Sequence, residues 1–126
     1  MPQEKEFVPH KESLELKELG FTPDYACAFQ TQEQNRFILF LYNKRDFKIA
    51  PHLLPSPSFQ QAFRWFREKF GFFYDVLQFE GGKWGYSIYG QIGFDAIFKH
   101  NHYNTYEQAE LECLRKLIEI VKSKQA

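Results

Sequence analysis

The segment SFQQAFRWFREKFG, residues 58–71, carries the strongest structural signal in the chain. Its apolar residues recur at the spacing i, i+3, i+4, i+7 and i+11, which places them on one stripe of an α-helix. They are Phe59, Ala62, Phe63, Phe66 and Phe70. Ser58 and Gln61 have the spacing of a capping box, in which each side chain bonds the other residue's backbone N–H, and Gly71 is typical of a helix end. The segment therefore predicts a helix whose phenylalanines face the core.

A hairpin is predicted directly after this helix. Residues 72–80 have the composition of a strand, and Gly81-Gly82 is a signal for a tight turn. Residues 83–90 then alternate, with aromatic and aliphatic side chains on one face. Residues 91–99 either extend this second strand or add another strand after a bend. The sequence therefore predicts two or three antiparallel strands in this part of the chain.

The C-terminal part of the sequence predicts a long helix over residues 106–122. Thr105 and Gln108 form its capping box, and residues 100–104 form a polar turn before it. Its apolar positions cover about half of the circumference, which is typical of a deeply packed helix. They are Ala109, Cys113, Leu114, Leu117, Ile118, Ile120 and Val121.

The N-terminal half of the chain predicts a helix and a second hairpin. Pro9 can open the helix, where a missing N–H costs nothing, and Gly20 can end it. Residues 24–30 alternate as a half-buried strand, and residues 36–42 are apolar on both sides, as in a central strand. Residues 43–58 contain three prolines and form a long connection, with an edge strand at residues 47–49 as an option.

The order of these elements favours the α+β class. Hairpins alternate with helices, so we expect an antiparallel sheet of four to five strands with three helices, mainly packed on one face of the sheet. A parallel sheet built from β-α-β units is the alternative. The length of 126 residues fits a single domain, residues 1–126. Residues 1–8 are polar for most of their length and are expected to form a flexible arm.

Composition excludes several classes of protein. The chain has sixteen basic and sixteen acidic residues, so a strongly basic nucleic-acid binder and an acidic tail protein are both disfavoured. No apolar run is long enough to cross a membrane, and no secretory signal is visible at the N-terminus. The two cysteines, Cys27 and Cys113, do not make a disulfide framework. We expect reduced core thiols in a cytoplasmic protein that does not contact a membrane.

Three segments resemble a family of small uncharacterised proteins. They are LKELGF (residues 16–21), QQAFRWFREK (residues 60–69) and YEQAELECLRKLIEIVK (residues 106–122). The family is encoded in prophage-like and other mobile elements of anaerobic gut bacteria. The resemblance covers the three predicted helices in order and implies a cytoplasmic protein of a mobile element. It implies no activity, and no functional residue is transferred by it.

No pattern of residues points to catalysis. Cys113 is predicted on a buried helix face, where an apolar setting makes a thiol inert, and no nucleophile elbow or phosphate-binding loop is present. The pair His100 and His102 is a weak alternative as a metal site, because alternate residues of a strand share a face, but no third ligand is fixed nearby. We expect no enzyme activity, no cofactor and no small-molecule substrate.

The basic residues are concentrated in residues 36–69. This region has seven bases and two acids, a net charge of +5. Bases beside exposed aromatic rings are typical of proteins that bind single-stranded nucleic acid. Trp65 lies beside Arg64 and Lys69 on the flank of the predicted helix. Binding of nucleic acid by this region is therefore the alternative function, against the simpler interpretation of a solvated helix face and loop.

Aromatic residues of the second hairpin favour a protein partner. Trp84 and Tyr86 alternate on one strand face, and an antiparallel sheet with helices on one side leaves its other side to be covered. We expect a non-catalytic interaction protein whose partner is a second copy of itself or another protein. The candidate binding surface consists of Lys44, Arg45, Arg64, Trp65, Arg67, Lys69, Trp84 and Tyr86.

Overall fold

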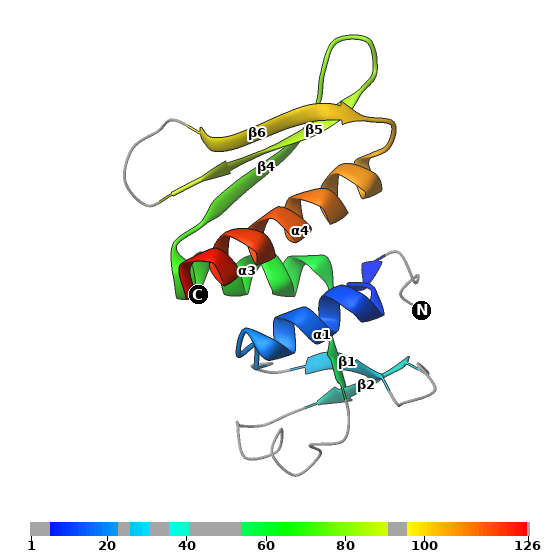
Figure 1. The fold of residues 1–126 in the computed structure, drawn as a ribbon. Helices are drawn as coiled ribbons and strands as arrows, with labels where there is room; N and C mark the ends of the chain where they lie inside the picture. Colours follow the sequence, from blue (N-terminus) through cyan, green and yellow to red (C-terminus); the bar gives the residue numbers. More distant parts are fainter. Residues whose placement is uncertain (1–5, 23–25, 31–35, 41–53, 91–95, 126) are drawn as a thin grey trace. The chain divides into compact units, whose positions relative to one another are not determined.

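The computed structural model describes residues 6–22, 26–30, 36–40, 54–90 and 96–125 (Figure 1). Residues Met1–Gln61 and Ala62–Ala126 form two compact units. Both units combine helices with antiparallel strands, so the predicted α+β class is confirmed. The assignment of residues 1–126 to a single domain stays a prediction.

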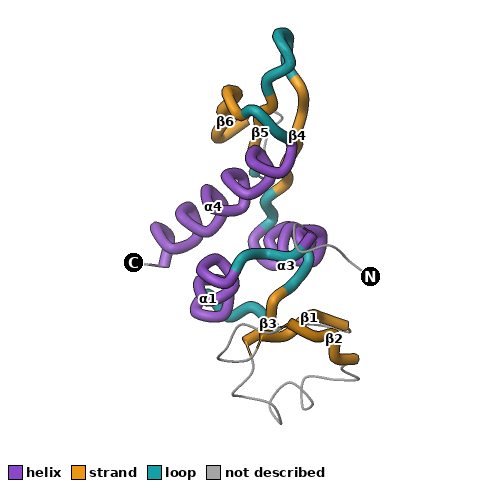
Figure 2. The backbone as a smooth tube through the Cα atoms, turned by 90° about the vertical axis from the view of Figure 1, so that its right-hand side faces the viewer, coloured by secondary structure: helices purple, strands orange, loops and turns teal. Residues whose placement is uncertain are grey.

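The first unit contains one described helix and a three-stranded antiparallel sheet. The elements are α1 (His10–Glu18), β1 (Ala26–Gln30), β2 (Arg36–Phe40) and β3 (Leu54–Ser56). The predicted hairpin of β1 and β2 is confirmed. The strand order is β2-β1-β3 (Figure 2). The prediction that residues 36–42 form a central strand is wrong, because β3 pairs with the second edge of β1 and leaves β2 at the edge of the sheet.

The strand β3 lies in a segment where the prolines argue against a strand. Pro55 stands opposite Phe29 of β1 in the register of the sheet. Proline has no backbone N–H to donate. A central strand is hydrogen-bonded to a neighbour on each side, whereas an edge strand is hydrogen-bonded on one side only and can therefore contain a proline. The position of β3 at the sheet edge is therefore what makes Pro55 acceptable. The alternative edge strand at residues 47–49 lies outside the described residues.

Residues 7 and 8 are fixed to the body of the first unit. Phe7 forms a β-bridge with Ser58, and the N–H of Val8 donates to the carbonyl of Pro57 over 2.8 Å. The hydroxyls of Ser13 and Ser56 both donate to the carbonyl of Val8. Val8 is fully buried. The prediction of a flexible arm over residues 1–8 is therefore wrong for these two residues, because their backbone is hydrogen-bonded and one side chain joins the core.

The second unit combines two helices with a second three-stranded sheet. Its elements are β4 (Phe73–Gln78), β5 (Trp84–Tyr89), β6 (Ala96–Tyr103) and α4 (Tyr106–Gln125), preceded by α3 (Phe59–Phe70), whose first turn belongs to the first unit. The strand order is β4-β5-β6, and all pairs are antiparallel. The helix α4 runs along one face of this sheet (Figure 1).

The helix α3 forms as its sequence predicts. The N–H of Ser58 donates to the side chain of Gln61, and the N–H of Gln61 donates to the hydroxyl of Ser58. These two bonds are the reciprocal pair of a capping box. Gly71 ends the helix with a φ of 75°, a left-handed conformation that glycine adopts without a steric penalty. The phenylalanine stripe is buried except for Phe70, which is half-buried.

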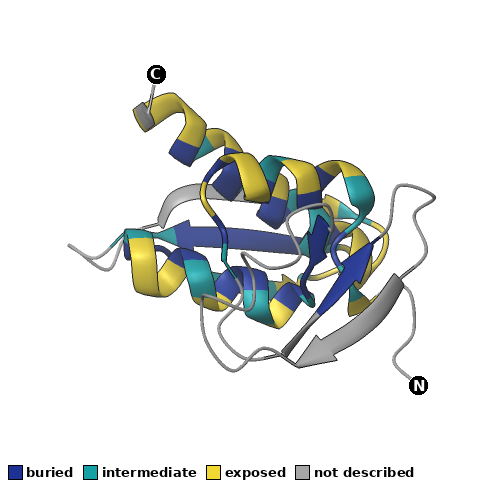
Figure 3. Cartoon of the chain, turned by 90° about the horizontal axis from the view of Figure 1, so that it is seen from below, coloured by how far each residue is buried: buried dark blue, intermediate teal, exposed yellow. Residues whose placement is uncertain are grey.

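The helix α4 buries one broad stripe of its surface, as predicted (Figure 3). The buried residues are Ala109, Cys113, Leu114, Leu117, Ile118 and Val121. Ile120 is only half-buried, because Val121 continues the row of residues four apart that begins at Ala109. At the N-terminus the N–H of Gln108 donates to the hydroxyl of Thr105, but the side chain of Gln108 accepts the N–H of Asn104 instead of that of Thr105.

None of the helices in the described part of the chain has the length and apolar character that a membrane crossing needs.

The sheet arrangement corrects the prediction of one sheet with four to five strands. The described strands form two sheets of three strands each. The strand β6 continues to Tyr103, so the predicted polar turn at residues 100–104 is shorter than expected. Two irregularities interrupt its pairing with β5. Trp84 and Tyr86 face Tyr103 and His100, and Ile88 and Tyr89 face Phe98 and Ala96, so β6 has one extra residue at each place.

Candidate functional site

The register of β4 and β5 divides their residues between two faces of the second sheet. Successive side chains of a strand point to opposite faces. One face, here called the covered face, lies under α4 and carries Tyr74, Val76, Trp84, Tyr86 and Ile88. The other face, here called the open face, carries Phe73, Asp75, Leu77, Gly85, Ser87 and Tyr89. Tyr86 is 4% exposed and Ile88 is 0% exposed, as expected for residues beneath a helix.

A cluster of aromatic rings fills the covered face. The ring of Tyr86 stacks on that of Tyr103, with a centroid separation of 6.1 Å and an interplanar angle of 16°. The ring of Tyr106, at the start of α4, meets the ring of Trp84 edge-on at 5.5 Å. Hydrogen bonding to Tyr103 contributes to the raised pKa of Tyr86, and hydrogen bonding to Glu110 contributes to the raised pKa of Tyr106. These contacts attach the N-terminal half of α4 to β5 and β6.

The tyrosine and cysteine side chains of this cluster are held in their protonated forms. Burial raises the pKa of Tyr86 and of Cys113 far above their ordinary values, and it raises the pKa of Tyr106 to about 12. Burial also raises the pKa of Glu110, while the hydrogen bond from Tyr106 acts in the opposite direction. A thiol with a raised pKa is a poor nucleophile at neutral pH. The covered face thus offers neutral hydrogen-bond donors and no activated nucleophile among its described residues.

The open face combines exposed apolar side chains with small residues. Phe73 and Leu77, both on the edge strand β4, are 46% and 51% exposed. On the central strand, Tyr89 stands opposite Phe73, Ser87 opposite Asp75 and Gly85 opposite Leu77. Large apolar side chains on β4 therefore stand in the same face as two small residues of β5. Exposed apolar area of this kind is typical of a site that another protein covers.

The outer surface of α3 is basic. Arg64 forms an ion pair with Glu68 over 2.9 Å, and both side chains are exposed. The ammonium group of Lys69 lies 5.9 Å from the ring centroid of Trp65, which is a cation–π contact. Arg67 is also exposed. Of these positive charges, Lys69 is the one that contacts the half-buried indole ring of Trp65.

The structure distributes the predicted binding residues over two separate surfaces. Arg64, Arg67 and Lys69 are exposed on α3, and Trp65 is half-buried on the same helix. Lys44 and Arg45 lie outside the described residues. Trp84 and Tyr86, by contrast, lie on the covered face.

The burial of Tyr86 removes it as a contact residue for a partner. Its side chain is covered by α4, which also contacts the rest of β5. The exposed apolar residues of the hairpin are instead Phe73 and Leu77 of β4. Residue spacing alone does not predict the exposure of Phe73 and Leu77. The alternation along a strand shows which residues share a face, but it does not show which face the last helix covers. The position of Gly85 opposite Leu77 and of Ser87 opposite Asp75 is the signal that was missed.

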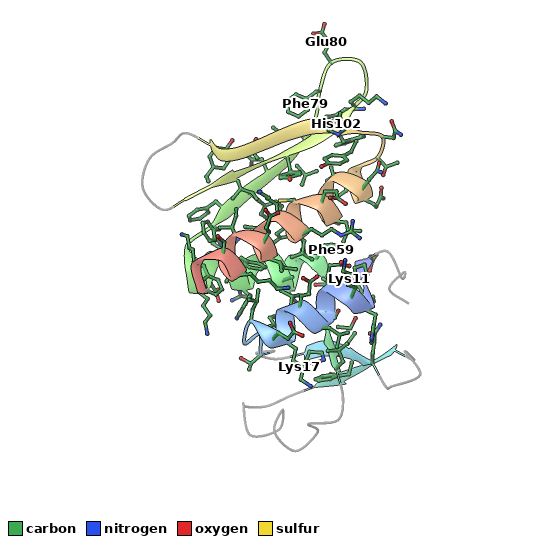
Figure 4. All side chains as sticks on the ribbon, viewed as in Figure 1. Lys11, Lys17, Phe59, Phe79, Glu80 and His102 are labelled. Atoms are coloured by element: carbon green, nitrogen blue, oxygen red, sulfur yellow. The ribbon has the colours of Figure 1, made fainter. Side chains whose placement is uncertain are left out.

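The histidine pair does not form a metal site with the residues that the structure describes. His102 is exposed on β6, and its ring stacks on that of the neighbouring Tyr103 at 5.1 Å (Figure 4). His100 stands opposite Tyr86 in the register of the sheet. Within the described ranges, no three side chains of the types His, Cys, Asp and Glu come close enough together to hold a metal ion.

Comparisons of the chain with protein-family models, with curated proteins and with solved structures give no match.

Proposed function

We propose that this protein acts by binding and not by catalysis, and that its open face binds a second copy of the same chain. The observation that carries the proposal is the exposure of Phe73 and Leu77 on one face of β4. Four large apolar residues are exposed in the described part of the chain, and two of them are this pair. A partner that covered Phe73 and Leu77 would lower the free energy, because burial of apolar area is favourable.

The shape of the open face favours a second copy as the partner. In a twofold symmetric dimer the same patch serves both chains, so the patch has to be complementary to itself. Phe73 and Leu77 of one copy can lie over the small residues Gly85 and Ser87 of the other, and the reverse contact follows from the symmetry. A patch without this pairing of large and small residues would not be complementary to the same patch on a second copy.

The size of the open face predicts a weak dimer. Three strands about 4.8 Å apart and six residues long, at about 3.3 Å per residue, give a face of about 300 Å². A standard interface buries about 800 Å² on each partner. We therefore expect dissociation constants in the micromolar range or above, which suits an interaction that forms at high local concentration.

The experiment is sedimentation equilibrium from low micromolar to submillimolar concentration. The parent chain should show reversible dimerisation, and Phe73→Lys with Leu77→Lys should remain monomeric over the whole range. Leu14→Lys is the matched control, because Leu14 is 43% exposed and belongs to α1 of the first unit, not to the open face. Circular dichroism checks that all three variants are folded. A parent chain that is monomeric at every concentration, or a control that abolishes the dimer equally, contradicts the proposal.

The proposal includes a cytoplasmic location and an origin in a mobile element. Both are what the resemblance of the three helical segments implies. The thiol of Cys113 is free and buried, which supports a compartment that keeps cysteines reduced. Cys27 lies in β1, but its side chain is outside the described residues.

A further inference from the structure

We infer that the outer edge of β4 binds an extended segment of another protein, which adds to the second sheet as an antiparallel strand. The segment carries a basic residue opposite Asp75, between two apolar residues at alternate positions. This inference does not depend on the proposed dimer, because the segment is held by backbone groups at the edge of the sheet. A chain that stays monomeric can still bind such a segment.

The outer edge of β4 has no neighbouring strand in the described part of the chain. In the strand order β4-β5-β6, β4 pairs with β5 on one side only (Figure 2). This pairing covers all six residues of β4 without interruption, so the strand is regular along its whole length. A regular edge presents a row of N–H and C=O groups with which another chain can pair.

The register of the hairpin identifies the backbone groups at this edge. The N–H of Phe79 donates to the carbonyl of Lys83 over 2.6 Å, so these two residues form a hydrogen-bonded pair. Hydrogen-bonded and non-hydrogen-bonded pairs alternate along an antiparallel ladder, and the pair next to it is Gln78 with Trp84. The inner residues, whose N–H and C=O groups bond to β5, are therefore Phe73, Asp75 and Leu77. The outer residues, whose groups point away from β5, are Tyr74, Val76 and Gln78.

The side chains along β4 determine which residues the added strand has to carry. Asp75 is exposed between Phe73 and Leu77, which are 46% and 51% exposed on the same face. Asp75 is the only charged residue of β4, and its carboxylate has no ion pair or hydrogen bond within the described ranges. Apolar pairs and pairs of opposite charge are favourable between residues that stand opposite each other on adjacent strands. The complement of β4 is therefore an apolar, a basic and an apolar residue at alternate positions.

A second copy of β4 complements this edge less well. In a symmetric antiparallel pair the open faces of both copies lie on the same side, so Asp75 of one copy stands opposite Asp75, Phe73 or Leu77 of the other. The first register places two like charges directly opposite each other, which is destabilising. The other two registers place a carboxylate against an apolar side chain. Because β4 contains no basic residue, the favoured partner is a segment of different sequence.

Amide hydrogen exchange of the full chain, followed by NMR, tests whether a peptide adds at this edge. The probe is the blocked peptide Thr-Val-Thr-Lys-Thr-Val-Thr, whose lysine stands opposite Asp75 and whose threonines stand opposite the outer residues. In the free protein the amides of the inner residues should exchange slowly and those of the outer residues fast. The peptide should slow the exchange of the outer residues at least about tenfold. Slow exchange of the outer residues in the free protein would overturn the inference, and protection that follows the chain concentration alone would assign the edge to a second copy.

Two matched peptides test whether backbone groups hold the segment. N-methylation of the two threonines next to the lysine removes donors that face β4 and should abolish binding, measured by fluorescence anisotropy of the labelled peptide. N-methylation of the two valines adds the same number of methyl groups on the side away from β4 and should leave binding intact. Equal effects of the two modifications would overturn the inference, because pairing with the edge distinguishes these positions.

A charge exchange tests the position of the basic residue. Asp75→Lys should weaken binding of the lysine peptide about fivefold, because the cross-strand pair changes from opposite to like charge. A peptide with glutamate in place of the lysine should bind Asp75→Lys as well as the lysine peptide binds the parent chain. Circular dichroism checks that Asp75→Lys is folded. An affinity for the lysine peptide that is unchanged in Asp75→Lys, or no recovery with the glutamate peptide, would contradict the proposed register.

Discussion

The division of the second sheet into a covered and an open face can be tested by comparing Ile88→Ala with Leu77→Ala. Ile88 is 0% exposed and lies beneath α4, whereas Leu77 is 51% exposed on the open face. Ile88→Ala removes three carbons at about 0.8 kcal/mol each, and the cavity raises the total to about 3 kcal/mol. Leu77→Ala removes three carbons that already contact water, so we expect a loss below about 1 kcal/mol.

Urea denaturation followed by tryptophan fluorescence measures this difference. With a dependence of about 1.5 kcal/mol per molar urea, Ile88→Ala should lower the unfolding midpoint by about 2 M. Ile88→Val is the graded control and should cost about 1 kcal/mol. Equal shifts for Ile88→Ala and Leu77→Ala would refute the assignment of the two faces, and the proposed dimer surface would be lost with it.

Two further predictions concern the buried acid groups. Burial raises the pKa of Tyr86, Tyr103 and Tyr106 in the folded state, so the stability they contribute is complete below the unfolded value of about 10 and is lost as the pH rises above it. The urea midpoint should therefore fall between pH 10 and pH 12, and less so in Tyr86→Phe; a midpoint independent of pH in this range would contradict the burial of these phenols. Burial also raises the pKa of Cys113, so its reaction with a thiol reagent at neutral pH should be slow in the native protein and fast in urea, and equal rates would show that the thiol is accessible.

The helices follow from the sequence because their signals are local. The capping residues Ser58 and Gln61 and the phenylalanine stripe lie within one helix, so spacing alone fixes its ends and its buried side. The same holds for α4, where the rows of residues four apart identify the buried stripe. In α4 the pairing partner of Gln108 differs, because its side chain can reach either of two neighbouring N–H groups, and Ile120 is only half-buried.

The candidate sites depend on contacts that no local pattern contains. The alternation of β5 shows that Trp84 and Tyr86 share a face, but the packing of α4 decides that this face is covered. The approach of Lys124 to Phe72 joins residues 52 positions apart, so no local pattern predicts it. The sequence does not predict the edge strand around Pro55 for a similar reason. Its strand conformation depends on pairing with β1 and not on its own composition.

The interrupted pairing of β6 limits how the second sheet can grow. An added strand needs an unbroken row of N–H and C=O groups at the sheet edge, and the two extra residues of β6 break that row. Of the two edge strands in this sheet, only β4 pairs with β5 without an interruption. If a sheet can pair through one edge only, two copies join through that edge and growth stops. Fibril formation requires both edges of the sheet. The irregular strand thus opposes open-ended polymerisation through the second sheet.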